Sequence, residues 1–135
     1  ERYHFSISHC GNYAAAMASS TQRVGIDIEL LTSRIHTISP KFLNIEEQLF
    51  ILDWEHLPQV HLQLATILWS SKECIFKWYG NGKVDFRKDI QLQMPAVFRP
   101  DEWMELSFHF NKNGGHHLKV NAKIFEGLVL AYVVS

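Results

Sequence analysis

Apolar and polar residues alternate with a period of two in four parts of the chain. In the segment VGIDIE at 24–29, three apolar residues alternate with a glycine and two acids. The same alternation returns near 90–94, 104–110 and 118–124. Each pattern predicts a strand with one face on a core. Residues 2–8 also predict a strand, and the continuous apolar run 128–134 is typical of a central strand. Residues 13–18 fit either a short helix or a strand.

Three other segments predict helices. The run 61–79 lacks Gly and Pro and ends at Gly80. Asn44 and Glu47 have the spacing of a capping box for a helix that reaches about residue 52. Ser39-Pro40 indicates another helix start, and Pro58 is expected in the loop before the long helix. At helical spacing, the apolar stripe of the long helix consists of Leu64, Ile67, Leu68, Cys74, Ile75, Trp78 and Tyr79.

The order of these segments predicts an α+β fold, with an antiparallel sheet packed against two or three helices. The chain has 135 residues, of which 47% are apolar, so a single domain over 1–135 is expected. The formal net charge of −1 gives no excess of positive charge of the kind that nucleic-acid-binding proteins carry. No apolar run is long enough to span a membrane. The two cysteines lack ligand spacing, which indicates reduced thiols in a cytoplasmic protein.

The acids of the segment 24–29 are the main candidates for chemistry. In a strand, Asp27 and Glu29 share one face with α-carbons roughly 7 Å apart, and the apolar residues are expected to face the core on the other side. Carboxylates suit a hard cation such as Mg²⁺, and Mn²⁺ accepts the same ligands. Glu73 is a candidate third acid and shares a helix face with Lys77. The alternative is a solvated Glu73–Lys77 salt bridge of little consequence.

Three segments, taken in order, resemble the signature motifs of the 4′-phosphopantetheinyl transferase superfamily. They are FSISHCG at 5–11, GIDIE at 25–29 and WSSKECIFK at 69–77. The likeness is greatest to the surfactin-synthetase-activating type, and it weakens after Asp89. It implies the α+β fold of that family, with residues 13–18 as a strand. It also implies transfer of the 4′-phosphopantetheine arm of coenzyme A to a serine of an acyl or peptidyl carrier protein, with release of adenosine 3′,5′-bisphosphate.

The resemblance also implies roles for individual residues. Asp27, Glu29 and Glu73 would hold Mg²⁺ against the pyrophosphate of coenzyme A, the substrate. Glu73, or a water that it orients, would take the proton from the incoming serine. A reaction of this kind needs alignment, charge neutralisation and a proton acceptor, and these residue types supply them.

Four further residues would bind coenzyme A under the same resemblance. Lys77 would contact the pyrophosphate and offset the charge that develops on the leaving phosphate. Ser8 and His9 would bind the nucleotide end, and Lys72 would be a second phosphate contact. Carrier choice among fatty-acid, polyketide and peptide synthesis is not encoded in these motifs.

The surfactin-activating type consists of two similar halves with coenzyme A in the cleft between them. This chain corresponds to the second half plus the last hairpin of the first, so we expect a fragment whose N-terminal half is absent. A full-length protein with both halves would be a pseudo-dimeric monomer. If the chain is not a fragment, a homo-oligomer would complete the cleft. Two other functions stay open at this stage. One is a different metal-dependent phosphodiester enzyme, and the other is a non-catalytic module that binds coenzyme A or a carrier protein.

Overall fold

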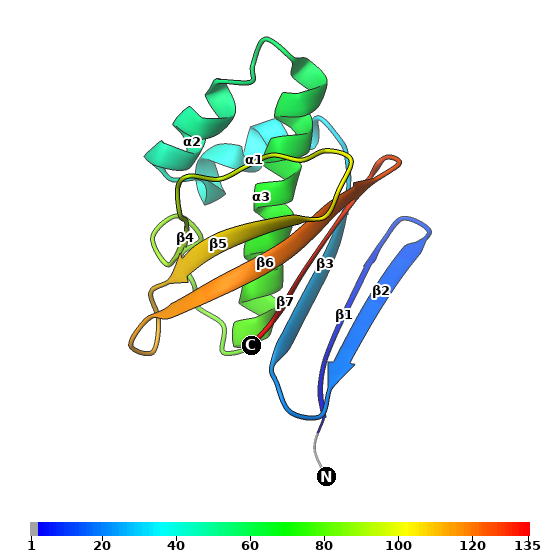
Figure 1. The fold of residues 1–135 in the computed structure, drawn as a ribbon, viewed down its shortest axis with the longest axis vertical. Coiled ribbons are helices and arrows are strands. Elements are labelled where there is room, and N and C mark those ends of the chain that lie inside the picture. Colours follow the sequence, from blue (N-terminus) through cyan, green and yellow to red (C-terminus); the bar gives the residue numbers. More distant parts are fainter. Residues whose placement is uncertain (1–2) are drawn as a thin grey trace.

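The computed structural model describes residues 3–135, so Arg2, placed in the first predicted strand, lies outside the described residues. Figure 1 shows the arrangement of seven strands and three helices. In chain order the elements are β1 (His4–Cys10), β2 (Tyr13–Ser19), β3 (Val24–Leu30), α1 (Arg34–Phe42), α2 (Ile45–Leu52), α3 (Pro58–Tyr79), β4 (Ile90–Leu92), β5 (Met104–Phe110), β6 (His116–Phe125) and β7 (Leu128–Val134).

The strands form two antiparallel sheets. The larger sheet has five strands in the order β3-β7-β6-β5-β4, and β1 pairs only with β2 in a separate hairpin. Figure 1 shows α3 crossing one face of the larger sheet, and the hairpin lying beyond the β3 edge. The predicted α+β class is therefore confirmed. The predicted central strand is also confirmed, because β7 lies between β3 and β6.

Two serine hydroxyls attach the hairpin to the larger sheet. The hydroxyl oxygens of Ser6 and Ser8 accept hydrogen bonds from the backbone N–H groups of Ile26 and Ile28, at 3.0 and 3.1 Å. Edge strands need partners for such groups. In β1 the two serines are buried and Ile7 between them is exposed, so the hydroxyl-bearing face of the hairpin is the one directed at β3. This contact brings β1 beside the acid-bearing strand.

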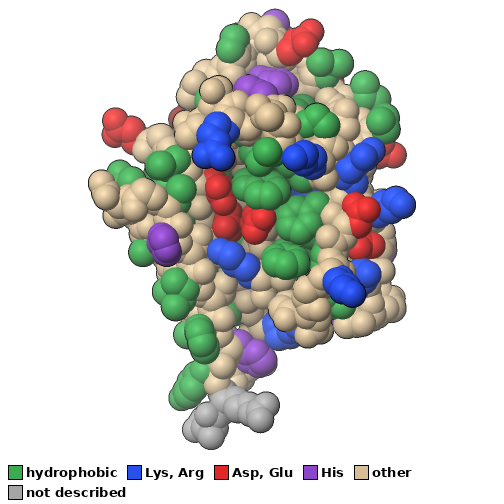
Figure 2. Space-filling model, turned by 180° about the vertical axis from the view of Figure 1, so that it is seen from behind, with side chains coloured by type: hydrophobic (Ala, Val, Ile, Leu, Met, Phe, Trp, Pro, Cys, Tyr) green, Lys and Arg blue, Asp and Glu red, His purple; other side chains and the backbone are tan. Residues whose placement is uncertain are grey.

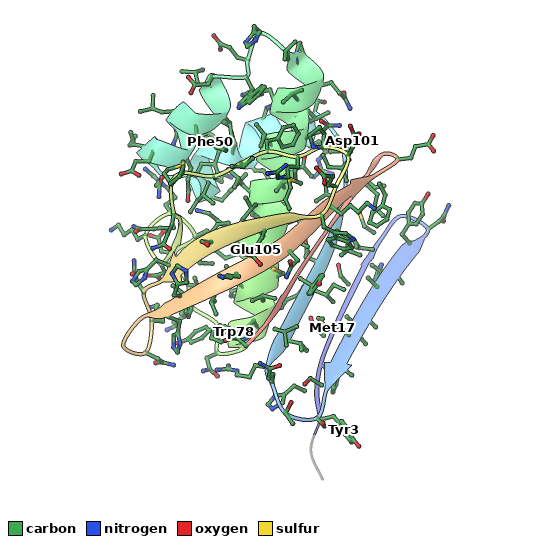
Figure 3. The ribbon with its side chains drawn as sticks, in the orientation of Figure 1. Tyr3, Met17, Phe50, Trp78, Asp101 and Glu105 are labelled. Atoms are coloured by element: carbon green, nitrogen blue, oxygen red, sulfur yellow. The ribbon has the colours of Figure 1, made fainter. Side chains whose placement is uncertain are left out.

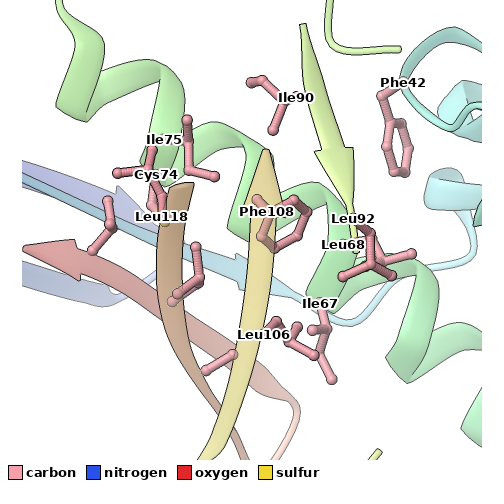
Figure 4. Close-up of a cluster of buried hydrophobic side chains, with 14 of the residues drawn as sticks. Phe42, Ile67, Leu68, Cys74, Ile75, Ile90, Leu92, Leu106, Phe108 and Leu118 are labelled. Atoms are coloured by element: carbon pink, nitrogen blue, oxygen red, sulfur yellow. The ribbon is translucent and has the colours of Figure 1, made fainter. Parts of the chain in front are cut away.

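The hydrophobic core lies between α3 and the larger sheet. The predicted apolar stripe of α3 is buried throughout, from Leu64 to Tyr79. Alternate residues of β5, namely Met104, Leu106, Phe108 and Phe110, are also buried, as the alternation predicts. Figure 4 shows part of this cluster, with Ile75 of α3 and Phe108 of β5 in it. Burial of such side chains is the main favourable term that holds the helix on the sheet.

Trp78 fastens the last turn of α3 to the ends of β7 and β5. Its indole N–H donates to the backbone oxygen of Ser135 at 3.2 Å, and its ring lies edge-on to Phe110. The guanidinium of Arg23 lies 4.8 Å from the ring centroid. Figure 3 shows Trp78 on α3 and Met17 on the hairpin. The end of α3 is therefore fixed next to β3, where the candidate acids lie.

The helix ends differ in part from the predictions. The capping box of α2 is confirmed, since Asn44 and Glu47 exchange side-chain and backbone hydrogen bonds at 2.9 Å. Gly80 ends α3 with a φ of 73°, as expected for a left-handed cap. Pro58 is not in a loop, because it forms the first turn of α3, where its missing N–H costs nothing.

The predicted helix start at Ser39-Pro40 is wrong, because Pro40 lies inside α1, near its end. Proline cannot donate to the carbonyl four residues back, which is that of His36. The Ser39 hydroxyl donates to this carbonyl at 3.2 Å instead. The helix ends at Phe42, so little of it depends on the lost hydrogen bond. Among the residues that the structure describes, no helix has both the length and the apolar character needed to cross a membrane.

Candidate functional site

The acid-bearing face of β3 is turned towards α3. Gly25 shows this most directly, because a Cβ atom at this position would lie 1.9 Å from the carbonyl oxygen of Cys74. Only glycine allows the strand and the helix to approach so closely. Val24, Ile26 and Ile28 are buried on the other face, outside the main hydrophobic cluster. The alternation was therefore predicted correctly, but the assignment of the acids to the side away from the core was wrong.

Asp27 is the most buried of the candidate acids, with an exposed fraction of 3%. Its Oδ1 accepts hydrogen bonds from the ammonium of Lys77 at 3.2 Å and from the hydroxyl of Ser8 at 3.4 Å. Its Oδ2 accepts one from the hydroxyl of Ser70 at 3.0 Å. Side chains from β1, β3 and α3 thus meet at one carboxylate.

Lys77 supplies the positive charge of the site. Its ammonium donates to the carbonyl oxygens of Ile26 and Ile7, at 3.0 and 3.4 Å, as well as to Asp27. The side chain of Lys77 is 28% exposed, so the ammonium lies at the mouth of the site and not beneath it. A cation in this position can contact an incoming phosphate while it remains close to Asp27. The predicted role of Lys77 at the pyrophosphate stays a prediction.

Glu29 and Glu73 lie in the same negative environment. Burial, followed by a hydrogen bond with Asp27 and the charges of Asp27 and Glu73, raises the pKa of Glu29 to about 8. A hydrogen bond from the indole of Trp69 opposes this rise. Burial and the charge of Asp27 raise the pKa of Glu73 to about 7, while the charge of Lys77 opposes the rise. Such shifts show that the three carboxyl groups interact, which is typical of functional sites.

The donor set suits a hard divalent cation, although the three acids do not form a closed ligand set. Within residues 3–135, no three His, Cys, Asp or Glu side chains are grouped tightly enough to form a metal site. The mutual repulsion of Asp27, Glu29 and Glu73 is nevertheless what a cation would relieve. Their oxygens are the ligands that Mg²⁺ prefers, and the two glutamates have rotatable bonds enough to turn towards Asp27. The residues therefore fit the proposed ion in their chemistry.

The Ser8-His9 pair is divided by the strand. Ser8 is buried and uses its hydroxyl to bind both the Ile28 N–H and Asp27. His9 points to the other face and is exposed. Successive side chains of a strand face opposite ways, so the two residues cannot act on one atom together. Ser8 is thus brought to the acids, and the predicted contact of the pair with the nucleotide stays untested.

Lys72 requires a correction, because it does not face the acids. Its side chain is fully buried, and its ammonium donates to Glu47, to the carbonyl oxygen of Phe42 and to that of Phe86, all at 2.7–2.8 Å. Burial lowers its pKa, and the charge of Glu47 opposes this. Unlike Lys77, which is 28% exposed, Lys72 has no exposed side-chain surface for a phosphate to contact. The predicted phosphate contact of Lys72 is therefore wrong for this structure, in which the residue joins α3 to α1, α2 and the loop before β4.

Two hollows share Trp69 as a lining residue, and the smaller of them reaches Glu29. The larger, about 850 Å³, is lined by the aromatic residues Phe42, Trp69 and Phe86, with Lys41, Lys83 and Arg87 among its other residues. The smaller, about 370 Å³, is lined in part by Glu29, Trp69 and Arg34. Figure 2 shows a face on which acidic side chains gather near the centre, between basic side chains and beside apolar ones. The smaller hollow thus offers space beside Glu29, and the larger one offers aromatic and basic side chains on the other side of Trp69.

Sequence reasoning missed Ser70 and Trp69 as parts of the site. Ser70 precedes Glu73 by three residues and Lys77 by seven, so all three share one face of α3. Trp69 lies four residues before Glu73. This helical spacing was a usable signal. What it did not reveal is that the shared face meets Asp27, which depends on the packing of α3 against β3.

Comparison with known proteins agrees with the motifs. Residues 23–133 match the model of the 4′-phosphopantetheinyl transferase superfamily. The matched region contains Asp27, Glu29, Glu73 and Lys77, whereas Ser8 and His9 lie before it. No curated protein matches the chain. Since the matched residues make up most of the chain and include the site, the chain belongs to the 4′-phosphopantetheinyl transferase superfamily.

Proposed function

We propose that this chain transfers the 4′-phosphopantetheine group of coenzyme A to a serine of an acyl or peptidyl carrier protein, with Mg²⁺ as cofactor. One observation carries the proposal. Asp27 of β3 pairs with Lys77 of α3, and the charge of Asp27 acts on both Glu29 and Glu73, all within the residues that match the transferase family. Segment 5–11 supports the surfactin-synthetase-activating type, because Ser8 reaches the same carboxylate.

In the proposed reaction, the serine oxygen of the carrier attacks the phosphorus that bears the pantetheine arm. A new oxygen–phosphorus bond forms, and the bond from that phosphorus to the bridging pyrophosphate oxygen breaks. Adenosine 3′,5′-bisphosphate leaves with the electron pair. The serine proton passes to the carboxylate of Glu73. A carboxylate is a suitable proton acceptor when it lies within reach of the attacking hydroxyl, directly or through one water.

Asp27, Glu29 and Glu73 would hold the Mg²⁺, which when bound supplies positive charge to the pyrophosphate oxygens. Mn²⁺ accepts the same oxygen ligands. Lys77 binds the pyrophosphate from the mouth of the site and offsets charge on the leaving group. Ser8 and Ser70 hold the Asp27 carboxylate in place.

The test is the intact mass of an apo carrier protein after incubation with this protein, coenzyme A and Mg²⁺. We expect a gain of one phosphopantetheine group. The variant Glu73→Gln should slow the transfer by about 10²-fold or more. The matched control is Glu105→Gln, which alters an exposed acid of β5 that pairs with Lys119. The mass gain should persist in this control.

Two results would contradict the proposal in different ways. Binding of coenzyme A without transfer to fatty-acid, polyketide and peptide carriers would indicate a non-catalytic binding module. Equal transfer rates in the wild type and Glu73→Gln would refute the assignment of Glu73 while leaving the activity in place.

A further inference from the structure

The hydrogen bond from Ser70 to Asp27 is buried and specific. Ser70 has an exposed fraction of 0%, and its hydroxyl oxygen lies 3.0 Å from Oδ2 of Asp27. The same hydroxyl lies 3.3 Å from the backbone oxygen of Asp27, so its single hydrogen is shared between these two acceptors or given to the nearer one. Within residues 3–135, Ser70 is the donor to Oδ2, whereas Lys77 and Ser8 both bind Oδ1.

The two oxygens of Asp27 therefore have different tasks. Oδ1 forms the ion pair with Lys77, and Oδ2 accepts the hydrogen bond from Ser70. The carboxylate of an aspartate can rotate about its terminal bond unless such contacts hold it. A hydroxyl that donates to a ligating carboxylate fixes its direction, and loss of such outer contacts weakens metal binding.

The adjacent Ser71 provides an internal comparison. It is buried to the same extent, with an exposed fraction of 0%. Its hydroxyl, however, has no hydrogen-bond partner among the described residues of the chain. The two serines are therefore equally buried, but only the hydroxyl of Ser70 contacts Asp27 among the residues that the structure describes. A purely structural preference for small residues at this point of α3 would treat them alike.

We propose that Ser70 is a positioning residue, whose hydroxyl orients Asp27 for a divalent cation. This inference rests on the proposed function, because it assumes that Asp27 binds the ion. It assigns to Ser70 no contact with the cation or with coenzyme A. Its effect reaches the site only through the Asp27 carboxylate.

The experiment measures Mn²⁺ affinity of the full chain by electron paramagnetic resonance, with free Mn²⁺ as the probe. Ser70→Ala should weaken binding about 10-fold or more, and Ser71→Ala should bind like the wild type. Thermal unfolding of both variants serves as the structural readout. Ser70→Thr and Ser70→Val have nearly the same shape but differ in the hydroxyl, so Thr should bind more tightly than Val. The comparison of Ser70→Thr with Ser70→Val tests the role of the hydroxyl even if Ser70→Ala fails to fold.

The outcomes separate this inference from the proposed function. If the wild type binds Mn²⁺ and both serine-to-alanine variants bind equally well, the positioning role is refuted and the metal site stands. If both alanine variants lose affinity in proportion to their loss of stability, the role of Ser70 is only structural and the inference fails. If the wild type itself does not bind Mn²⁺, the proposed metal site is wrong, and the inference falls with it.

Discussion

The buried pair of Lys72 and Glu47 gives the sharpest prediction for stability. Lys72 donates to three oxygens, and Glu47 in turn accepts from the backbone N–H of Leu92 at 2.7 Å. Both side chains have an exposed fraction of 0%. The substitution Lys72→Met has nearly the same length but removes the charge and all three donors. It leaves Glu47 as a buried carboxylate without a counter-ion.

Breaking a buried ion pair from one side costs about 3–5 kcal/mol, because the remaining charge has lost its partner. A domain of this kind has a free energy of unfolding of about 5–15 kcal/mol, so the loss is a large share of the total. With a urea slope of about 2 kcal/mol per molar, the unfolding midpoint should fall by about 2 M.

The assay is urea unfolding followed by circular dichroism. The control is Lys119→Met, which breaks an exposed pair with Glu105 whose side chains are 60% and 58% exposed. Exposed pairs contribute about 0–1 kcal/mol, so this variant should unfold almost like the wild type. The double variant Lys72→Met with Glu47→Gln removes both buried charges. It should lose less stability than the sum of the two single variants.

A different result would refute this reasoning. If Lys72→Met unfolds within about 1 kcal/mol of the wild type, the ammonium is not the buried counter-ion described above. If it keeps full stability but loses affinity for coenzyme A, Lys72 acts at a phosphate after all. The structure predicts the opposite, namely lost stability and, in the folded fraction, unchanged affinity for coenzyme A.

Three further outcomes follow from the site and its supports. Gly25→Ala should lower the free energy of unfolding by about 1–3 kcal/mol and slow transfer, because the added methyl group collides with the Cys74 carbonyl. A variant with normal stability in urea unfolding and normal transfer activity would contradict the close packing. Burial raises the pKa values of Glu29 and Glu73 from 4.5 to about 8 and about 7, so the folded state holds these protons more tightly than the unfolded state. Without divalent cations, the thermal unfolding midpoint should therefore decrease as the pH is raised from about 5.5 to about 8.5. The decrease should be smaller in Glu73→Gln or with added Mg²⁺. An increase of the midpoint in the wild type over this pH range would contradict the prediction. Asn44→Ala should lower the free energy of unfolding by about 1 kcal/mol, because α2 loses its cap, and should leave the Mn²⁺ affinity unchanged. Urea unfolding measures the first effect, and Mn²⁺ titration measures the second.

The sequence by itself determined the features that depend on neighbours along the chain. The stripe from Leu64 to Tyr79 fixed α3, because helical spacing places its apolar side chains on one side. The Asn44–Glu47 capping box and the Gly80 stop are equally local. The family resemblance, carried by short motifs, also follows from sequence alone. The exception is Pro40, whose lost hydrogen bond is tolerated near the end of α1 because the Ser39 hydroxyl replaces it.

The tertiary structure decided which side of each element is used. Alternation showed that Asp27 and Glu29 share a face, but only the packing of Gly25 on α3 shows that this face meets the helix. The one-dimensional pattern placed Lys72 beside Glu73, yet adjacent helical residues point about 100° apart, and long-range contacts bury Lys72 against Glu47. The periodicity of a segment shows which of its side chains share a face. The residues that this face contacts belong to segments distant in the chain, so the pattern alone does not identify them. Asp27 and Ser70, 43 residues apart, are therefore joined only by the fold.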